Sequence, residues 1–112
     1  MRLETKTLDR LIEQIVAIAR PQRILLFGSA ARGELREGSD VDLMVVMPDG
    51  THRRHTAQDL YEGIYRALPK LGIAFDLLVA TESDLKRHAA TPGLIYAGAL
   101  RDGRLVYEAK SA

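Results

Sequence analysis

Cysteine and tryptophan are absent from this sequence, and aromatic side chains are scarce, with four tyrosines and two phenylalanines in 112 residues. The absence of cysteine excludes disulfides and thiolate metal sites, and it is compatible with a reducing cytoplasm. The formal net charge is only +1 at pH 7, so the chain as a whole gives no electrostatic signal for nucleic-acid binding. No basic groove interleaves the tyrosines, and we expect them to pack in the core or at its rim rather than to stack on bases.

Long apolar runs are also missing. No stretch approaches the length of a membrane span, and the charged residues 1–10 favour a helix over a signal sequence, so we expect a cytoplasmic protein. There is no internal repeat, linker or low-complexity segment, and the length suits a single domain over residues 1–112. A domain of this size has little room for a separate substrate-binding part, so a large substrate would be held mainly by a partner.

Helices are expected where apolar residues recur at three- and four-residue steps, over residues 7–20 and 55–70. The first of these should end before Pro21, because proline disfavours helical geometry in the residue that precedes it. Thr81 and Asp84 have the spacing of a capping box and predict the start of a third helix. We expect Pro92-Gly93 to interrupt that helix before it continues toward residue 100.

Between these helices, short apolar runs bounded by turn residues predict strands, over residues 24–27, 41–47, 73–80 and 105–107. The first two are apolar throughout most of their length, which is typical of strands buried on both faces. The order helix, strand, strand, helix, strand, helix, strand predicts an α/β or α+β domain. We expect a small mixed sheet with flanking helices.

Two carboxylates stand at the start of the strand expected over residues 41–47, which is otherwise apolar. Side chains alternate across a strand, so Asp40 and Asp42 project from one face while the residue between them points to the other. Repulsion and desolvation would favour a retained proton at neutral pH unless a divalent cation neutralises the pair. If the 73–80 strand pairs beside this one, Asp76 reaches the same face and completes a three-carboxylate cluster. Oxygen ligands of this kind suit Mg²⁺ or Mn²⁺.

The segment before these aspartates has the features of an anion site. Gly28 follows a strand and lets the backbone approach a ligand closely. Ser29 offers a hydroxyl and a backbone N–H at the start of a short helical turn expected over residues 30–34. Phosphates held there and metal ions held by the aspartates would meet at one end of the sheet, an arrangement that fits phosphoryl-group chemistry.

The spacing of these motifs resembles a known family. Gly28-Ser29, ten intervening residues and then Asp40-Val41-Asp42 is similar to the signature of the polymerase-beta-like nucleotidyltransferases. With Arg32-Gly33-Glu34 inside the gap, the chain looks like the minimal members of that superfamily. The closing stretch over residues 96–108 also resembles the way in which many of these small proteins end. The resemblance implies the polymerase-beta-like nucleotidyltransferase fold.

The resemblance also implies roles for individual residues. Asp40 and Asp42 would bind two Mg²⁺ ions, for which Mn²⁺ could substitute, and Asp76 would bind one ion and help to deprotonate the attacking hydroxyl. Gly28 and Ser29 would hold the outer phosphates of the nucleotide, ATP being the expected substrate. Further candidates for nucleotide binding are Arg32 and Ser39. The implied reaction is attack of an acceptor hydroxyl on the α-phosphorus of a nucleoside triphosphate, with release of pyrophosphate.

Several of these residues have alternative interpretations. Asp76 could pair with an arginine, either Arg23 or Arg32, and Ser29 could simply cap a helix. Arg32 could form a surface ion pair with a glutamate of residues 34–37. The basic run over residues 51–56 is typical of a solvated loop, although it could also dock an acidic partner or RNA.

Because the chain is short, the acceptor must bring its own binding surface, and this points to a protein. The resemblance implies an antitoxin that attaches AMP to a hydroxyl, expected to be that of a tyrosine, on a helical HEPN-type toxin. One alternative is a non-catalytic antitoxin that occludes its partner. Another is transfer to a small hydroxylated molecule such as an aminoglycoside. Relatives with that activity generally have an extra helical domain, for which a separate subunit or a homodimer could substitute. Transfer to an RNA end is a further alternative, which no basic face supports.

Overall fold

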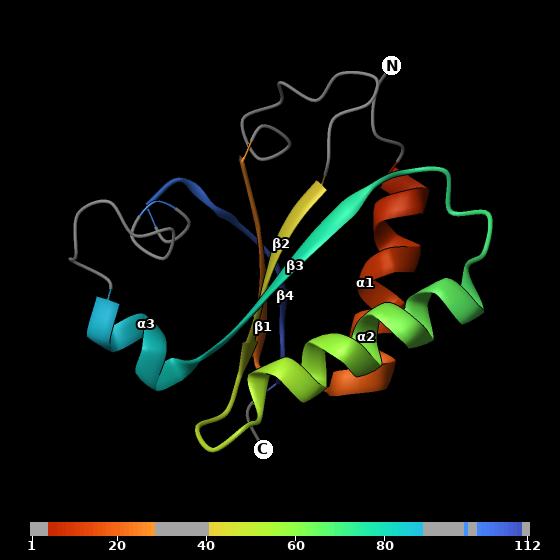
Figure 1. The fold of residues 1–112 in the computed structure, drawn as a ribbon. Helices are drawn as coiled ribbons and strands as arrows, with labels where there is room; N and C mark the ends of the chain where they lie inside the picture. The colour runs from red at the N-terminus through yellow and green to blue at the C-terminus, as the bar shows by residue number, and fades with distance from the viewer. Residues whose placement is uncertain (1–4, 29–40, 89–97, 99–100, 111–112) are drawn as a thin grey trace.

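The computed structural model describes residues 5–28, 41–88, 98 and 101–110 (Figure 1). The chain order of the elements is α1 (Thr5–Ala19), β1 (Arg23–Phe27), β2 (Val41–Met47), α2 (Arg53–Ala67), β3 (Phe75–Thr81), α3 (Glu82–His88) and β4 (Arg104–Glu108). The strands form one sheet in the order β3-β2-β1-β4. Strand β1 is antiparallel to β2 and β4, whereas β2 and β3 are parallel. The mixed sheet and the order of elements confirm the predicted fold class.

Helices cover both faces of the sheet. Helices α1 and α2 lie on one side, and the short helix α3 lies on the other (Figure 1). Strand β2 runs through the centre, and its alternating side chains divide into two cores. Leu43 and Val45 belong to the larger core with α1 and α2, and Met44 and Val46 belong to a smaller core with Leu85 of α3. Because β2 lies between two helical layers, it is buried along almost its whole length, as its apolar composition predicts.

The ends of several elements differ from the sequence prediction by a few residues, for local reasons. Helix α1 ends at Ala19, and Arg20 has a φ of 49° in the left-handed region before Pro21. Helix α2 ends at Ala67, three residues before the predicted end. Leu68 has a φ of −128° and a ψ of 63°, which is outside the helical region, because it precedes Pro69.

The start of α2 corrects the interpretation of residues 51–56 as a solvated loop. The helix begins at Arg53, so most of this basic run forms its first turn. His52 caps the helix, since its Nδ1 accepts a hydrogen bond of 3.1 Å from the backbone N–H of His55. A basic residue therefore takes the place of the usual aspartate or serine at this helix terminus.

The predicted capping box at the start of α3 is confirmed. The backbone N–H of Asp84 donates to Thr81 Oγ1 at 3.2 Å, and the backbone N–H of Thr81 donates to Asp84 Oδ2 at 3.0 Å. The interruption predicted at Pro92-Gly93 and the turn predicted over residues 30–34 lie outside the described residues. Among the helices that the structure describes, none is long and apolar enough to cross a membrane.

Candidate functional site

The pairing of β2 with β3 brings two of the predicted carboxylates together. Asp42 and Asp76 are register partners in the parallel ladder, so their Cα atoms lie opposite each other on adjacent strands. Such strands are about 4.8 Å apart, and partners in register point to the same face of the sheet. Asp42 is half-buried and Asp76 is exposed. The condition that the sequence left open, pairing of the third strand beside the second, is therefore met.

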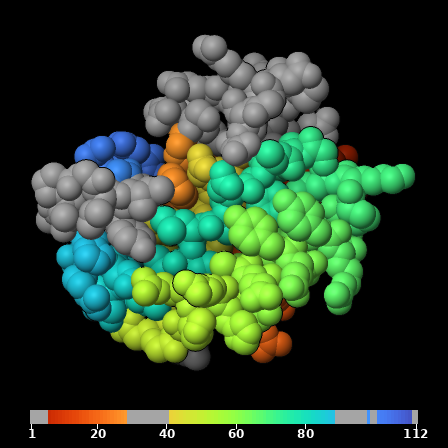
Figure 2. All heavy atoms as spheres, viewed as in Figure 1, coloured from red at the N-terminus to blue at the C-terminus, as the bar shows by residue number. Residues whose placement is uncertain are grey.

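These carboxylates occupy the face of the sheet away from α1 and α2. Val41 and Leu43, on either side of Asp42, belong to the core under those two helices, so Asp42 projects in the opposite direction. On that face the next residue along β2 is Met44, which belongs to the core beneath α3. The last residues of β1 and the first residues of β2, orange and yellow in the space-filling view, reach the surface beside β3 (Figure 2). The pair thus lies where the apolar interior ends.

Gly28 lies directly against the Asp42 side chain. Its predecessor Phe27 is the register partner of Asp42 across β1 and β2, and Gly28 itself has a φ of 72°. A Cβ atom built on Gly28 would overlap with Oδ2 of Asp42 and would lie 3.4 Å from the Cγ atom of that residue. Both the backbone angle and the lack of space therefore require glycine here. The sequence predicted that Gly28 lets the backbone approach a ligand closely, and this stays a prediction. The described group beside Gly28 is the Asp42 carboxylate.

The other residues predicted for the site cannot be placed beside this pair. Asp40, Ser29, Arg32 and Ser39 all lie outside the described residues. Within the described part of the chain, no three histidine, aspartate or glutamate residues gather into a group that could hold a metal ion. Asp42 and Asp76 nevertheless provide adjacent oxygen donors on one face, and the donor chemistry fits a hard divalent cation that completes its coordination with water and phosphate.

Arg23, one of the arginines considered as a partner of Asp76, makes a different ion pair. Its guanidinium donates to both carboxylate oxygens of Glu82, with Nη2 3.0 Å from Oε1 and 3.1 Å from Oε2. Arg23 is in register with Val46, toward the other end of β2 from Asp42. The pair therefore ties β1 to α3 at the end of the sheet that lies away from the carboxylates.

Tyr61 of α2 contacts the strand that carries Asp76. Its hydroxyl accepts a hydrogen bond of 2.8 Å from the backbone N–H of Leu77. Its ring stacks on Phe75, with 5.6 Å between the centroids and an interplanar angle of 14°. The sequence predicted packing at the core or its rim for this tyrosine, but it gave no signal for the hydrogen bond, which depends on where α2 crosses β3.

A second polar network lies at the far end of β2 and β3. The Asp84 carboxylate is nearly buried and accepts a 3.1 Å hydrogen bond from Arg53 Nη1. The hydrogen bond from the Thr81 backbone lowers the pKa of Asp84, against an opposing effect of burial. Hydrogen bonds from Ser83 likewise lower the pKa of Asp49. These contacts join the first turns of α2 and α3, and they pair Arg53 of the basic run with an acid of the same domain.

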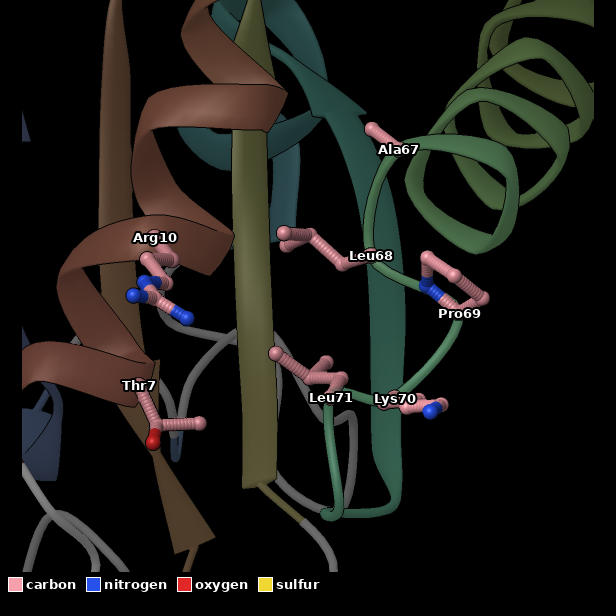
Figure 3. A pocket seen from close by; sticks show the side chains of 7 residues that line it. All are labelled: Thr7, Arg10, Ala67, Leu68, Pro69, Lys70 and Leu71. Carbon is pink, nitrogen blue, oxygen red and sulfur yellow. The ribbon is translucent and has the colours of Figure 1, made fainter.

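A pocket of about 240 Å³ lies on the face of the sheet that α1 and α2 cover, between α1 and the segment that follows α2 (Figure 3). Its lining residues are Thr7, Arg10, Ala67, Leu68, Pro69, Lys70 and Leu71. Asp42 and Asp76 project from the opposite face, so this pocket is not part of the carboxylate site.

Comparison with known proteins gives a family match and two related folds. The family model described as "Nucleotidyltransferase domain" matches residues 8–103. No curated protein matches the chain. A candidate nucleotidyltransferase from Sulfolobus solfataricus is 18% identical with a TM-score of 0.55, over 92% of this chain and 78% of that one. A toxin-antitoxin structure with AMP-PNP is 21% identical with a TM-score of 0.56, over 96% of this chain and 76% of that one.

Proposed function

Because the chain belongs to the nucleotidyltransferase domain family, we propose that it transfers AMP from ATP to a hydroxyl group of a partner protein. The observation that carries this proposal is the register pairing of Asp42 with Asp76, with Gly28 against Asp42 at the same end of the sheet. The family match supports an enzyme that uses a nucleoside triphosphate. The identity of the nucleotide and of the acceptor goes beyond that match.

Asp40, Asp42 and Asp76 would hold two Mg²⁺ ions, and Mn²⁺ could replace them. When bound, these ions neutralise charge between the carboxylates and the triphosphate, which would otherwise repel each other. Asp42 is fixed by its place on the central strand and by its contact with Gly28. Asp76 is exposed on the edge strand, where an acceptor can reach it. The two acids thus combine one constrained carboxylate with one accessible carboxylate.

In the proposed reaction, the acceptor oxygen forms a bond to the α-phosphorus of ATP while the bond to the bridging oxygen of the β-phosphate breaks. The hydroxyl proton passes to the Asp76 carboxylate, and pyrophosphate leaves with the bridging oxygen. Gly28 and Ser29 would hold the outer phosphates, with Arg32 and Ser39 contributing to nucleotide binding. An oxygen nucleophile and an oxygen leaving group in line with the phosphorus are the usual requirements of this reaction class.

For the acceptor, we propose the tyrosine of a HEPN-type toxin, so that the chain acts as an antitoxin. A fold shared with a toxin-antitoxin structure that contains AMP-PNP supports a toxin as the partner and an adenine nucleotide as the substrate, and the HEPN type of the toxin is our proposal. We further propose that the protein acts in the cytoplasm, where ATP and such a partner would both be present.

The test is to incubate the full chain with Mg²⁺, ATP labelled at the α-phosphate, and lysate of the source cell. We expect a labelled protein band whose modified residue, mapped by mass spectrometry, is a tyrosine carrying AMP. Asp42→Asn and Asp76→Asn should abolish the label, whereas Asp59→Asn should retain it. Asp59 is a suitable control because it is an exposed acid of α2.

Retained labelling by both site variants would contradict the proposed chemistry. Label found on RNA or on a small molecule would keep the nucleotidyl transfer and replace the acceptor. If no label moves with any nucleotide or with Mn²⁺, and the Asp42→Asn variant still neutralises the partner, the chain is a binding antitoxin rather than an enzyme.

A further inference from the structure

Tyr61 touches the residues on both sides of Asp76. The ring stacks on Phe75, which precedes Asp76, and the hydroxyl accepts the hydrogen bond from Leu77, which follows it. One side chain of α2 therefore contacts both sequence neighbours of Asp76, whose own side chain projects from the opposite face of the sheet. Figure 1 shows α2 running beside β3, on the same face of the sheet as α1.

The hydrogen bond from Leu77 uses a backbone group that no other described strand reaches. Among the strands that the structure describes, β3 lies at the edge of the sheet and pairs with β2 alone. In a parallel ladder, alternate residues direct their backbone groups to the same neighbour. The Ala74 carbonyl accepts from Val41 of β2 at 3.0 Å, so Asp76 also faces β2 while Leu77 faces the open edge. Tyr61 thus holds β3 from the side where the sheet gives no support.

This support matters at the position of Asp76. Asp76 is the second residue of β3, and this strand begins directly after a segment without helix or strand over residues 68–74. Strand ends at a sheet edge are held by few backbone hydrogen bonds and open more easily than central strands. Asp42 needs no equivalent, since β2 is flanked by strands on both sides. The less constrained of the two carboxylates is therefore the one that Tyr61 flanks.

We propose that Tyr61 is a positioning residue, which holds Phe75 and Leu77 and thereby keeps the Asp76 carboxylate beside Asp42. The assignment of Asp76 to metal binding rests on the proposed function, and the positioning itself rests on the contacts of Tyr61. Side chains that orient the ligands of a metal site commonly alter metal affinity when they are changed. Tyr61 acts through the backbone of β3 and does not touch the reacting atoms.

The test uses Tyr61→Phe, which keeps the ring on Phe75 and removes only the hydroxyl. Tyr65→Phe is the matched control, because Tyr65 lies one helical turn away, stacks on Tyr61 and packs against Phe75 at a tilt of 34°. Its side chain is 59% exposed, and none of the hydrogen bonds described above involves its hydroxyl. Titration of the full chain with Mn²⁺, followed by electron paramagnetic resonance, measures metal affinity without any nucleotide transfer. Amide hydrogen exchange of Asp76 and Ala80, whose backbone groups face β2, reports whether the start of β3 opens before the rest of the strand.

We expect Tyr61→Phe to bind Mn²⁺ about fivefold more weakly, in proportion to the loss of one hydrogen bond, and Tyr65→Phe to bind as the wild type does. Exchange at Asp76 should accelerate more than exchange at Ala80. A merely structural role would lower the melting temperature and leave the Mn²⁺ affinity of the folded protein unchanged.

Equal Mn²⁺ affinity in Tyr61→Phe and the wild type would overturn the positioning role, whether or not the wild type transfers nucleotide. A wild-type chain that binds no Mn²⁺ would overturn it as well. If the wild type and both variants show the expected Mn²⁺ affinities but no nucleoside triphosphate supports transfer, the proposed function fails and the positioning role stands.

Discussion

Replacing Gly28 with alanine should damage both stability and function, because two separate costs meet at this residue. Its φ of 72° lies in the left-handed region, where a side chain costs about 1–2 kcal/mol. The added Cβ would also overlap with Oδ2 of Asp42. The overlapped atom is the tip of a half-buried side chain, and rotating the Asp42 carboxylate away from its preferred angle costs roughly 0.5–1.5 kcal/mol more. We therefore expect Gly28→Ala to lower the free energy of unfolding by about 1.5–3.5 kcal/mol.

Gly50→Ala separates the two costs. Gly50 also has a positive φ, of 89°, but a Cβ built on it meets no atom within 4 Å. This variant should therefore lose only the backbone part, about 1–2 kcal/mol. Urea unfolding of both variants, followed by circular dichroism, gives the difference that belongs to the contact with Asp42.

Function provides the second measurement. Because the overlap can be relieved only by moving Asp42 or the end of β1, Gly28→Ala should weaken Mn²⁺ binding and label transfer even where the protein is fully folded. Gly50→Ala lies at the opposite end of β2 and should keep both activities. Equal unfolding free energies for the two variants would refute the overlap. Normal Mn²⁺ affinity in Gly28→Ala would show that this contact does not set the position of Asp42.

Two further predictions concern stability away from the carboxylates. The pKa of Asp84 lies below its ordinary value of 3.8 because the folded protein stabilises the charged form. The contribution of Asp84 to the free energy of unfolding is therefore present above pH 3.8, and it is lost as the pH falls through the lower pKa of the folded state. Unfolding free energies measured from pH 6 downward should therefore fall less steeply for Asp84→Asn than for the wild type, and parallel curves would contradict this. Leu43→Ala removes most of a fully buried side chain of the larger core. It should lower the free energy of unfolding in urea by about 2–5 kcal/mol and preserve the Mn²⁺ affinity of the folded protein. A decrease below about 1 kcal/mol would mean that the cavity collapses.

The sequence predicted the strands well where their composition left no alternative. Residues 41–47 form β2 as expected, because a short valine-rich run closed by Pro48-Asp49-Gly50 favours a strand over a helix. The end of α2 was placed too late, because Leu68 continues the apolar spacing of the helix while Pro69 removes it from helical geometry. Periodicity reports which residues are buried, and it says less about the residue at which the backbone turns.

The candidate site was predictable in part for a similar reason. Two aspartates in an apolar strand are visible in the sequence, but the position of Asp76 beside Asp42 depends on which strands pair and in which register. The Gly28 signal was also visible, as a glycine at the end of a strand. The hydrogen bond from Leu77 to Tyr61 was not, because it requires that β3 be an edge strand and that α2 cross it at one particular residue.

The alternation of β2 explains how one strand can serve stability and chemistry at once. Leu43 and Val45 face the larger core, and their burial against α1 and α2 holds the strand in place. Asp42 projects from the other face, at the point where the smaller core under α3 no longer covers the sheet. A carboxylate there gains a rigid support without lying in the interior of either core, so its desolvation cost stays limited. On the edge strand the same rigidity is not available from neighbouring strands, and Tyr61 supplies a hydrogen bond and an aromatic contact in their place.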